Sequence, residues 1–446
     1  LLYHGGLSIY TTLDPVAQDS AERALEKQIL SLQQRLNRIF LDSTRLDKTM
    51  KIPRERFLNE FDSIYTANEV AFTQYPDSIK LRKAQMAVVA LDVQSGAIRT
   101  LIGGRNFNET KFNRIYARRQ PGSAFKPFVY TAAMEHDFTP ASVVLDQPIT
   151  LMTDQGEWRP ENHERVFYGP ITIRNALARS ANLVAIQVLT KVGAQVVIDY
   201  ARRMGLKQQM NPVPSLAIGA CEVTPMEMAS AYSIYANSGV RATPYYIEKV
   251  VDKTGRVLES HTPSEKEVLS PQTAYLMASL MRSVVCCGTG ASIPASGFTR
   301  PAAGKTGTTD DYSDAWFVGY TPQISCAVWA GVDERRSLGR GVTGSVGAIP
   351  VWVKTMSALH KKLPVKDFER PAGIKTEAVC SESHLFATPA CPKSENEFFY
   401  SETQLQSCDI HGSERKNQNM MKVFAAPQGD KSKKDDSKKK KSGLMF

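Results

Sequence analysis

Two groups of apolar, strand-like segments lie on either side of a long stretch rich in helical patterns, and this order constrains the fold most. Residues 86–92 and 97–103 form the first group and are joined by a glycine-containing turn, which predicts a hairpin. Residues 305–309, 316–320 and 324–332 form the second group. The order predicts an α+β fold with one antiparallel sheet of about five strands and a large helical insertion between strands 2 and 3.

The insertion contains apolar residues at helical spacing and one further hairpin. Helices are predicted at residues 123–136, 173–191, 196–204, 225–238 and 271–285. The hairpin is predicted at residues 245–251 and 256–259.

The N-terminal part begins as a strand and continues as a long amphipathic helix. Asp14 and Pro15 supply an N-cap and a first-turn proline, and apolar residues then recur at helical spacing from Ala21 to Ile39. No apolar run reaches the roughly 18 residues of a transmembrane helix, and no signal peptide is recognisable. We therefore expect a fragment whose N-terminal portion, with any membrane anchor, has been removed.

These patterns divide the chain into four regions. We expect a linker region at residues 1–83 that follows a missing N-terminal domain, a main domain at 84–362, a cysteine-containing extension at 363–425 and a disordered basic tail at 426–446. Seven Lys and three Asp between residues 430 and 441 supply +4 of the net charge of +10. The rest of the chain has an ordinary surface charge, so no nucleic-acid partner is expected.

The seven cysteines do not predict a metal site, because none has the paired spacing of a zinc site and histidine is scarce. Cys380, Cys391 and Cys408 cluster in the extension, where a disulfide is expected if the compartment is oxidising. The odd number leaves at least one thiol unpaired within the chain. Cys326 lies in an apolar strand and is expected in the core.

The segment Ser123-Ala-Phe-Lys126 supplies a candidate nucleophile and base. A Pro-Gly break precedes it and an apolar helical segment follows, so Ser123 is expected at a helix N-terminus. Lys126 lies one turn further on the same face, within reach of the serine. A serine hydroxyl needs such a base, and Lys126 can act as one only if burial or a neighbouring cation depresses its pKa.

Two further segments complete the constellation. Ser180-Ala-Asn182 interrupts a helical pattern; Ser180 could relay a proton to a departing amine, and Asn182 offers a donor and an acceptor to a peptide amide. Lys305-Thr306-Gly307-Thr308 begins a strand after small residues, so a substrate backbone could lie beside it. A lysine with flanking hydroxyls can bind a carboxylate, and a strand N–H can complete an oxyanion hole.

Each motif also occurs a second time, in a context that favours an ordinary role. Ser437-Lys-Lys-Lys440 lies in the basic tail, Ser394-Glu-Asn396 in the polar extension, and Lys253-Thr-Gly255 in a turn between two short strands. An isolated motif of this kind is usually a helix cap, a polar break or a turn. The agreement of order, context and chemistry at 123, 180 and 305 selects one set.

This set resembles that of the penicillin-binding proteins, specifically the transpeptidase part of the class A, bifunctional members. The similarity covers most of residues 5–360 and extends to neighbouring segments, namely Gly6-Leu-Ser-Ile-Tyr-Thr-Thr-Leu-Asp14, Arg119-Gln-Pro-Gly-Ser-Ala-Phe-Lys-Pro127, Gly288-Thr-Gly290 and Asp314-Ala-Trp-Phe-Val-Gly-Tyr320. It implies a penicillin-binding-protein/β-lactamase-like transpeptidase fold, with residues 84–362 as the transpeptidase domain. Class A members also carry an N-terminal glycosyltransferase, so the parent would polymerise glycan and the present residues would not.

The resemblance implies a D,D-transpeptidase that cross-links peptidoglycan stem peptides through a Ser123 acyl-enzyme. The catalytic residues would be Ser123, Lys126, Ser180 and Lys305, and the substrate-binding residues would be Asn182, Thr306, Gly307 and Thr308. The backbone N–H groups of Ser123 and Thr308 would form the oxyanion hole. No cofactor is implied.

The implied partners are stem peptides, nascent glycan strands and β-lactams, with membrane contact only through the missing N-terminal segment, on the periplasmic side of a bacterial inner membrane. Two alternatives remain open. One is a D,D-carboxypeptidase or β-lactamase, although Glu222 and Glu227 have no context that marks a deacylating carboxylate. The other is a catalytically silent penicillin-binding scaffold.

Overall fold

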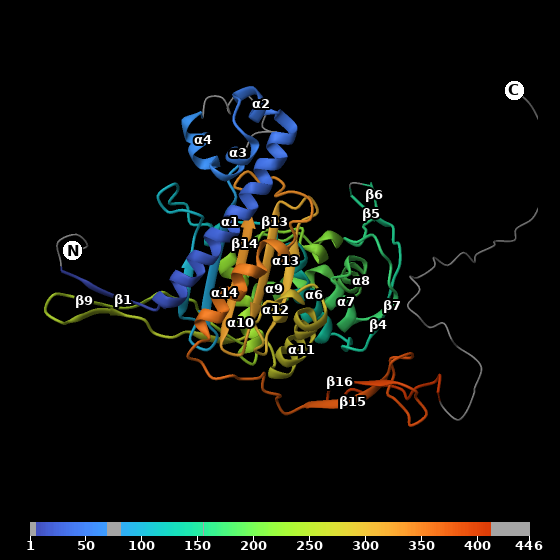
Figure 1. Ribbon diagram of the computed structural model, residues 1–446. Helices are drawn as coiled ribbons and strands as arrows, with labels where there is room; N and C mark the ends of the chain where they lie inside the picture. The colour runs from blue at the N-terminus through green and yellow to red at the C-terminus, as the bar shows by residue number, and fades with distance from the viewer. Residues whose placement is uncertain (1–5, 69–81, 155, 412–446) are drawn as a thin grey trace, which may run out of the picture.

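A five-stranded antiparallel sheet forms the centre of the molecule (Figure 1). The computed structural model describes residues 6–68, 82–154 and 156–411. The strand order of the central sheet is β12 (Ala303–Thr308), β13 (Asp314–Tyr320), β14 (Ile324–Gly331), β2 (Gln85–Asp92) and β3 (Ile98–Ile102). The predicted sheet, with its helical insertion between strands 2 and 3, is confirmed, and β12 is an edge strand with one unpaired side.

The strands are apolar on both faces because both faces are covered. On β2, Val89 and Leu91 face the helices of the insertion, and Val88 and Ala90 face the opposite layer. The helices of the insertion are α6 (Lys126–Met134), α7 (Ile173–Arg179), α8 (Asn182–Val192), α9 (Ala194–Arg203), α10 (Pro225–Ala236) and α11 (Pro271–Cys287), with the 3-10 turns η1 (Arg114–Tyr116), η2 (Gly122–Phe125) and η3 (Pro214–Ile218).

The opposite layer consists mainly of α1 (Pro15–Thr44) and α14 (Ile349–Leu359). The predicted cap of α1 is present, because the Asp14 carboxylate accepts hydrogen bonds from the N–H groups of Val16 and Ala17, each at 3.0 Å. Ile39 was expected on the buried stripe but is 47% exposed. The shorter helices are α2 (Leu46–Met50), α3 (Arg54–Asn59), α4 (Phe61–Ala67), α12 (Ser292–Ala295) and α13 (Gly344–Gly347).

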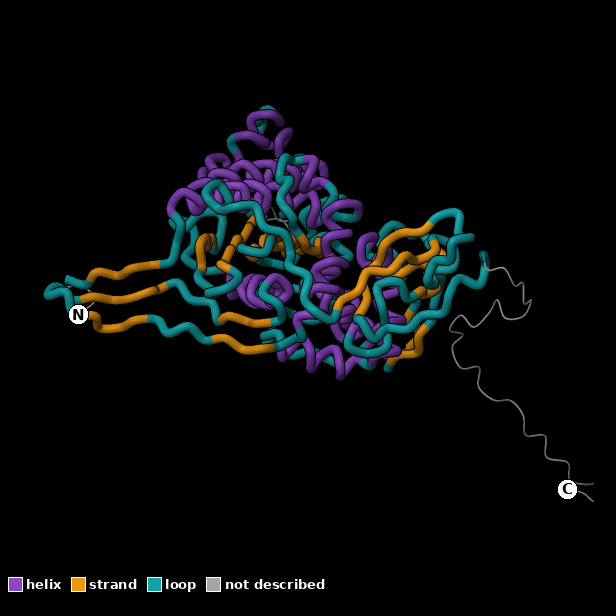
Figure 2. Tube along the Cα trace, turned by 90° about the horizontal axis from the view of Figure 1, so that it is seen from below, coloured by secondary structure: helices purple, strands orange, loops and turns teal. Residues whose placement is uncertain are grey.

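Smaller sheets lie around this body. β1 (Ser8–Thr11), β9 (Ile247–Val251) and β10 (Val257–Ser260) form a three-stranded sheet that reaches away from the body (Figure 2). The two-stranded pairs are β4 (Val143–Asp146) with β7 (Gly169–Thr172), β5 (Leu151–Thr153) with β6 (Gly156–Trp158), β8 (Val240–Ala242) with β11 (Glu265–Glu267), and β15 (Ile374–Cys380) with β16 (Ser394–Tyr400).

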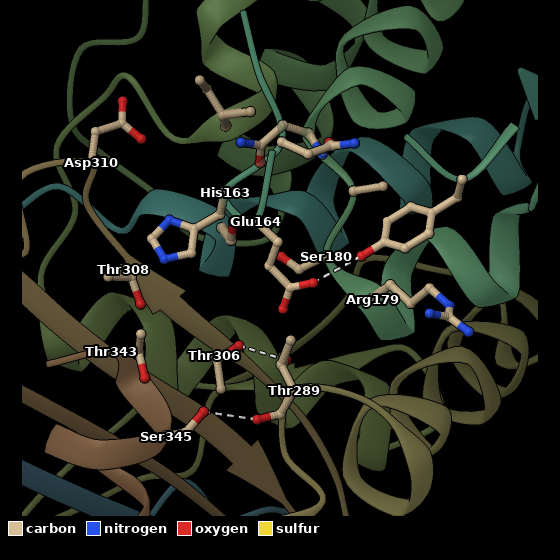
Figure 3. A pocket seen from close by; sticks show the side chains of 16 residues that line it. His163, Glu164, Arg179, Ser180, Thr289, Thr306, Thr308, Asp310, Thr343 and Ser345 are labelled. Carbon is tan, nitrogen blue, oxygen red and sulfur yellow. Dashed lines mark hydrogen bonds between the residues drawn. The ribbon is translucent and has the colours of Figure 1, made fainter. Parts of the chain in front are cut away.

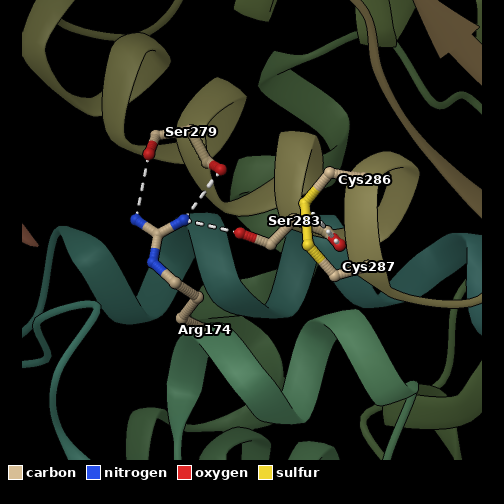
Figure 4. Close-up of a disulfide and its surroundings, with 5 residues drawn as sticks. All are labelled: Arg174, Ser279, Ser283, Cys286 and Cys287. Atoms are coloured by element: carbon tan, nitrogen blue, oxygen red, sulfur yellow. Dashed lines mark hydrogen bonds between the residues drawn. A yellow bond between two sulfur atoms is a disulfide. The ribbon is translucent and has the colours of Figure 1, made fainter. Parts of the chain in front are cut away.

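The predicted basic tail lies outside the described residues. Within them, no single helix has the length and apolar composition to cross a membrane; α8 and α9, bent by 94°, meet those criteria only as a pair. Cys326 is fully buried, as expected. A disulfide joins the adjacent residues Cys286 and Cys287 at the end of α11 (Figure 4). The three cysteines of the extension are free thiols.

Candidate active site

Ser123 lies on η2, a 3-10 turn that leads directly into α6, so its place near a helix start matches the sequence expectation. Two buried side chains hold the surrounding loop. The Trp316 indole donates to the carbonyl of Gln120 at 2.8 Å, and the Tyr232 hydroxyl donates to the carbonyl of Ala124 at 2.6 Å. Ser123 is thus held on a rigid turn at the wall of a cavity.

Gly122 lets this turn lie against the edge strand β12. Its φ is +52°, and a Cβ there would stand 2.4 Å from the carbonyl oxygen of Thr308. Gly307 shows the same close approach from the strand side, because a Cβ would stand 2.2 Å from the carbonyl oxygen of Pro121. Only glycine fits both constraints at Gly122, the positive φ and the backbone contact.

Ser180 is the break in the helical pattern. It ends α7 with φ +60°, a left-handed conformation that is uncommon for serine, and α8 begins at Asn182. The helical pattern predicted at residues 173–191, with its interruption at Ser180, is therefore two helices. The turn between them directs Ser180 and Asn182 toward the lysines.

Two fully buried lysines converge on the Ser180 hydroxyl. Lys126 Nζ donates to Ser180 O at 2.5 Å, Asn182 Oδ1 at 2.7 Å and Ser180 Oγ at 3.2 Å. Lys305 Nζ donates to Ser180 Oγ at 2.9 Å and to the carbonyl of Thr306 at 3.0 Å. No hydrogen bond joins Ser123 to Lys126 among the residues the structure describes; the Lys126 amine is held instead by the Ser180 turn.

Burial lowers the pKa of both amines. The pKa of Lys126 lies well below its ordinary value of 10.5, first because of desolvation and second because Lys305 is close by, with Asp310 and Asp146 opposing the shift. Desolvation lowers the pKa of Lys305 to about 7. Lys305 can therefore be neutral near pH 7, and the lowered pKa of Lys126 favours the neutral amine that a lysine base requires.

A second set of contacts supports Asn182. Its backbone N–H donates to Asn162 Oδ1 at 2.7 Å, and its side-chain amide donates to the carbonyl of Glu161 at 2.9 Å. Asn162 in turn donates to the buried carboxylate of Asp146 at 2.9 and 3.0 Å. This chain of hydrogen bonds fixes the amide that holds Lys126.

The hydroxyls of the strand are also held in place. Thr306 Oγ1 lies 2.7 Å from Thr289 Oγ1, Ser345 Oγ donates to the carbonyl of Thr289 at 2.9 Å, and the N–H of Gly344 donates to Thr308 Oγ1 at 3.1 Å. Figure 3 shows Thr306, Thr308, Thr343 and Ser345 on one side of the cavity.

The cavity has a volume of about 270 Å³ and brings together Ser123, Ser180, Asn182, Thr306 and Thr308. Lys126 and Lys305 lie behind its wall, buried beneath Ser180. Sequence reasoning missed several polar lining residues, namely His163, Glu164, Tyr168, Arg179, Asp310, Thr343 and Ser345 (Figure 3). Most lie in irregular segments without periodicity; a neighbouring motif was a signal for Arg179, which directly precedes Ser180, and for Asp310, two residues after Thr308.

The second copies of the motifs lie apart from the cavity. Asp252 accepts hydrogen bonds from the N–H and hydroxyl of Thr254, which closes the turn between β9 and β10 and confirms the turn interpretation. Ser394 and Asn396 belong to β16, and residues 437–440 lie outside the described residues.

One group of potential metal ligands exists in the described part of the chain, and it lies in the C-terminal extension rather than in the cavity. It consists of Cys380, Cys391, Cys408 and His411. The sequence argument excluded a metal site on spacing and missed this cluster, because the fold brings together ligands that are far apart along the chain. The short Cys408-x-x-His411 spacing was the available signal.

Comparison with known proteins identifies the family to which the chain belongs. Residues 86–336 match the model of the penicillin binding protein transpeptidase domain. Penicillin-binding protein 1A of Aquifex aeolicus is 33% identical over 409 residues, which cover 83% of this chain and 56% of that protein. The chain thus spans about half the length of this curated relative.

Two solved structures share the fold. Penicillin-binding protein 1A from Haemophilus influenzae superposes with a TM-score of 0.76 at 23% identity, over 90% of this chain and 73% of that one. PonA1 from Mycobacterium tuberculosis, in complex with penicillin V, gives 0.63 at 27% identity, over 83% and 90%. Since residues 86–336, more than half of the chain, match the family model, the chain belongs to the penicillin-binding protein transpeptidase family.

Proposed function

We propose that this chain cross-links peptidoglycan stem peptides as a serine D,D-transpeptidase and is acylated by β-lactams at Ser123. Membership of the transpeptidase family supports an acyltransferase or serine acyl hydrolase activity. The observation that carries the proposal is the convergence of two buried lysines on Ser180 Oγ, at 3.2 Å and 2.9 Å, behind the wall that holds Ser123. This arrangement supplies a low-pKa amine and a hydroxyl relay next to a nucleophile.

In the acylation step, Ser123 Oγ attacks the carbonyl carbon of the D-Ala-D-Ala amide and its proton passes to the neutral amine of Lys126. The Ser123–Lys126 contact forms in the complex, since catalytic hydrogen bonds are often long before substrate binds. The backbone N–H groups of Ser123 and Thr308 hold the developing oxyanion. The C–N bond then breaks, and the departing amine takes the proton through Ser180.

The second half-reaction reverses this order. The amine of a neighbouring stem peptide attacks the acyl-enzyme, loses its proton through Ser180 to Lys126, and Ser123 leaves with a proton restored. The hydroxyls of Thr306 and Thr308, which line the cavity, hold the substrate carboxylate, and the ammonium of Lys305, buried behind them, attracts it electrostatically. Since β12 is an edge strand with small residues, the donor peptide lies along it as an added strand, with Asn182 bonding its amide.

Labelling with a fluorescent penicillin tests the nucleophile. Ser123→Ala should abolish labelling while the far-UV circular dichroism spectrum is unchanged, and Ser437→Ala, in the second Ser-x-x-Lys motif, should label normally. Persistent labelling of a folded Ser123→Ala variant would refute the assignment. Labelling of the wild-type chain at Ser123, followed by slow release of the penicilloyl group, would disfavour the silent-scaffold alternative.

Incubation with a stem peptide and an acceptor amine separates transfer from hydrolysis. Two carboxylates considered for deacylation are engaged elsewhere, because Glu222 pairs with Arg335 at 2.6 Å and Glu227 caps α10. Glu164 and Asp310 are the carboxylates that line the cavity. We expect cross-linked dimer as the main product. If the wild-type chain instead gives mainly hydrolysed monomer, and Glu164→Gln does not form it, the activity is that of a carboxypeptidase. The reaction is proposed to take place on the extracytoplasmic side of the membrane, where the substrate lies.

A further inference from the structure

The C-terminal hairpin module, residues 374–411, brings four soft ligand atoms to one point. The sulphur atoms of Cys380, Cys391 and Cys408 and a ring nitrogen of His411 all lie within 4.8 Å of one another. His411 Nδ1 is 3.4 Å from Cys380 Sγ and 3.3 Å from Cys408 Sγ. Tetrahedral ligands placed about 2.0 to 2.3 Å from a common centre are separated by comparable distances.

The backbone of the module is folded around these ligands. Cys380 ends β15 and its N–H donates to the carbonyl of Leu385 at 2.9 Å, while the N–H of Cys408 donates to the carbonyl of Phe386 at 2.8 Å. Backbone N–H groups also point at sulphur: that of Glu382 donates to Cys380 Sγ at 3.5 Å, and that of Thr388 to Cys391 Sγ at 3.2 Å. Such bonds favour thiolates.

His411 is oriented as a metal ligand requires. Its Nδ1 faces the sulphur atoms, and its Nε2 lies 3.5 Å from the carboxylate of Glu382. Histidines that bind a metal through one ring nitrogen commonly present the other to a carboxylate, which fixes the tautomer.

The module also lacks a hydrophobic core sufficient to fold by itself. Its buried apolar cluster consists of Val379 and Phe399 together with Ala141 of the main body, with Phe386 and Leu405 packed at the margin. Units smaller than about 40 residues usually need a metal, disulfides or oligomerisation. Its cysteines are free thiols, so a metal is the remaining intramolecular cross-link.

We propose that Cys380, Cys391, Cys408 and His411 bind one structural zinc ion. Three thiolates and one imidazole form the sulphur-rich tetrahedral set that zinc prefers, and they exclude magnesium and calcium, which take oxygen ligands. Binding converts each protonated thiol to a thiolate and releases its proton to solvent, with no change of oxidation state. Four protein ligands leave no open position, so the ion has a structural and not a catalytic role.

The first test uses the wild-type chain, purified with reductant and incubated with zinc. Inductively coupled plasma mass spectrometry should find one zinc ion per chain after dialysis. Alkylation with iodoacetamide followed by peptide mass spectrometry should modify Cys380, Cys391 and Cys408 only after a chelator removes the zinc. The buried thiols of Cys221 and Cys326 serve as internal controls that the chelator leaves unchanged.

Matched variants locate the ion. His411→Asn should lose zinc, whereas His384→Asn, in the same module but outside the cluster, should retain it. Glu382→Gln should weaken zinc affinity by about 10- to 100-fold, as expected for loss of a supporting carboxylate. The circular dichroism spectrum of each variant should match that of the wild-type chain, which shows that the main body is still folded when zinc is lost.

Three results would overturn the proposal: a reduced chain that binds no zinc, zinc that remains at full stoichiometry in His411→Asn, or a disulfide between two of the three cysteines that reductant does not open in favour of zinc. None of these results bears on Ser123 labelling, so the failure of this proposal is distinct from the failure of the proposed enzymatic function.

Discussion

Replacing Gly122 by alanine tests whether the contact between the Ser123 turn and β12 sets the catalytic geometry. Gly122 has φ +52°, and a Cβ would meet the carbonyl oxygen of Thr308 at 2.4 Å and its nitrogen at 3.1 Å. Neither neighbour is a flexible side chain. The strand or the turn must therefore move, and with it one of the two backbone N–H groups proposed for the oxyanion hole.

The size of the effect follows from these distances. An ordinary contact begins near 3.4 Å, so the backbone must shift by about 1 Å from 2.4 Å. A misplacement of about 1 Å costs about 100-fold in rate, which corresponds to about 2.7 kcal/mol of transition-state stabilisation. The left-handed conformation itself costs alanine about 1–2 kcal/mol of folding free energy, independently of the clash.

The second-order rate of acylation by a fluorescent penicillin measures the first effect, and thermal unfolding measures the second. Gly255→Ala is the matched control, because Gly255 has φ +87° with no atom within 4 Å of the added Cβ. Both variants should lose the stability that the left-handed conformation costs, and Gly122→Ala should lose more because of its clash, but only Gly122→Ala should acylate slowly. Wild-type acylation in Gly122→Ala, or an equal loss in Gly255→Ala, would refute the reasoning.

Further predictions concern charge. The rate of acylation should rise with pH through an inflection well below 10.5, because Lys126 must be neutral and its pKa is lowered by burial and then by Lys305; an inflection near 10.5 would contradict the proposed base. The second-order rate constant of acylation by an anionic penicillin should fall above about pH 7, where Lys305 loses its charge. The pH–rate profile should therefore be bell-shaped. A neutral penicillin ester should not show the fall at high pH. Arg174→Met should leave the carboxylate of Glu397 without its bidentate partner at 2.6 Å and weaken docking of the hairpin module by about 3–5 kcal/mol. Limited proteolysis after residue 362 should then be faster than in the wild-type chain. An unchanged digestion rate would argue against a stabilising role of the ion pair.

The central sheet could be predicted because its strands are apolar on both faces. Val88 and Val89 both lie in cores, on opposite sides of β2, and such runs are recognisable without knowledge of the partners. Ile39 shows the limit of the same approach, since the buried stripe of α1 continues through Phe40 and Leu41, which pack against the short helices that follow, and leaves Ile39 exposed.

The site could be predicted as a set of residues but not as a network. Spacing placed Lys126 beside Ser123, whereas its amine binds Ser180 and Asn182, because a buried amine needs acceptors and the turn at Ser180 provides them. Glu164 and Asp310 reach the cavity from irregular segments, and Cys380 reaches His411 from across the hairpin. Contacts of this kind depend on the whole fold.

The contacts of Arg174 bear on where this polypeptide can be divided. Arg174 lies on the short helix α7, and it bonds Ser279 and Ser283 beside the Cys286–Cys287 disulfide (Figure 4). It also bonds Glu397 of β16. A chain shortened to the expected boundary at residue 362 would lose the only carboxylate among these partners. A chain truncated at residue 362 would therefore need a neutral residue in place of Arg174, because the guanidinium would otherwise lose its carboxylate partner. A residue inside the family match at 86–336 is therefore held in part by a carboxylate that lies outside that match.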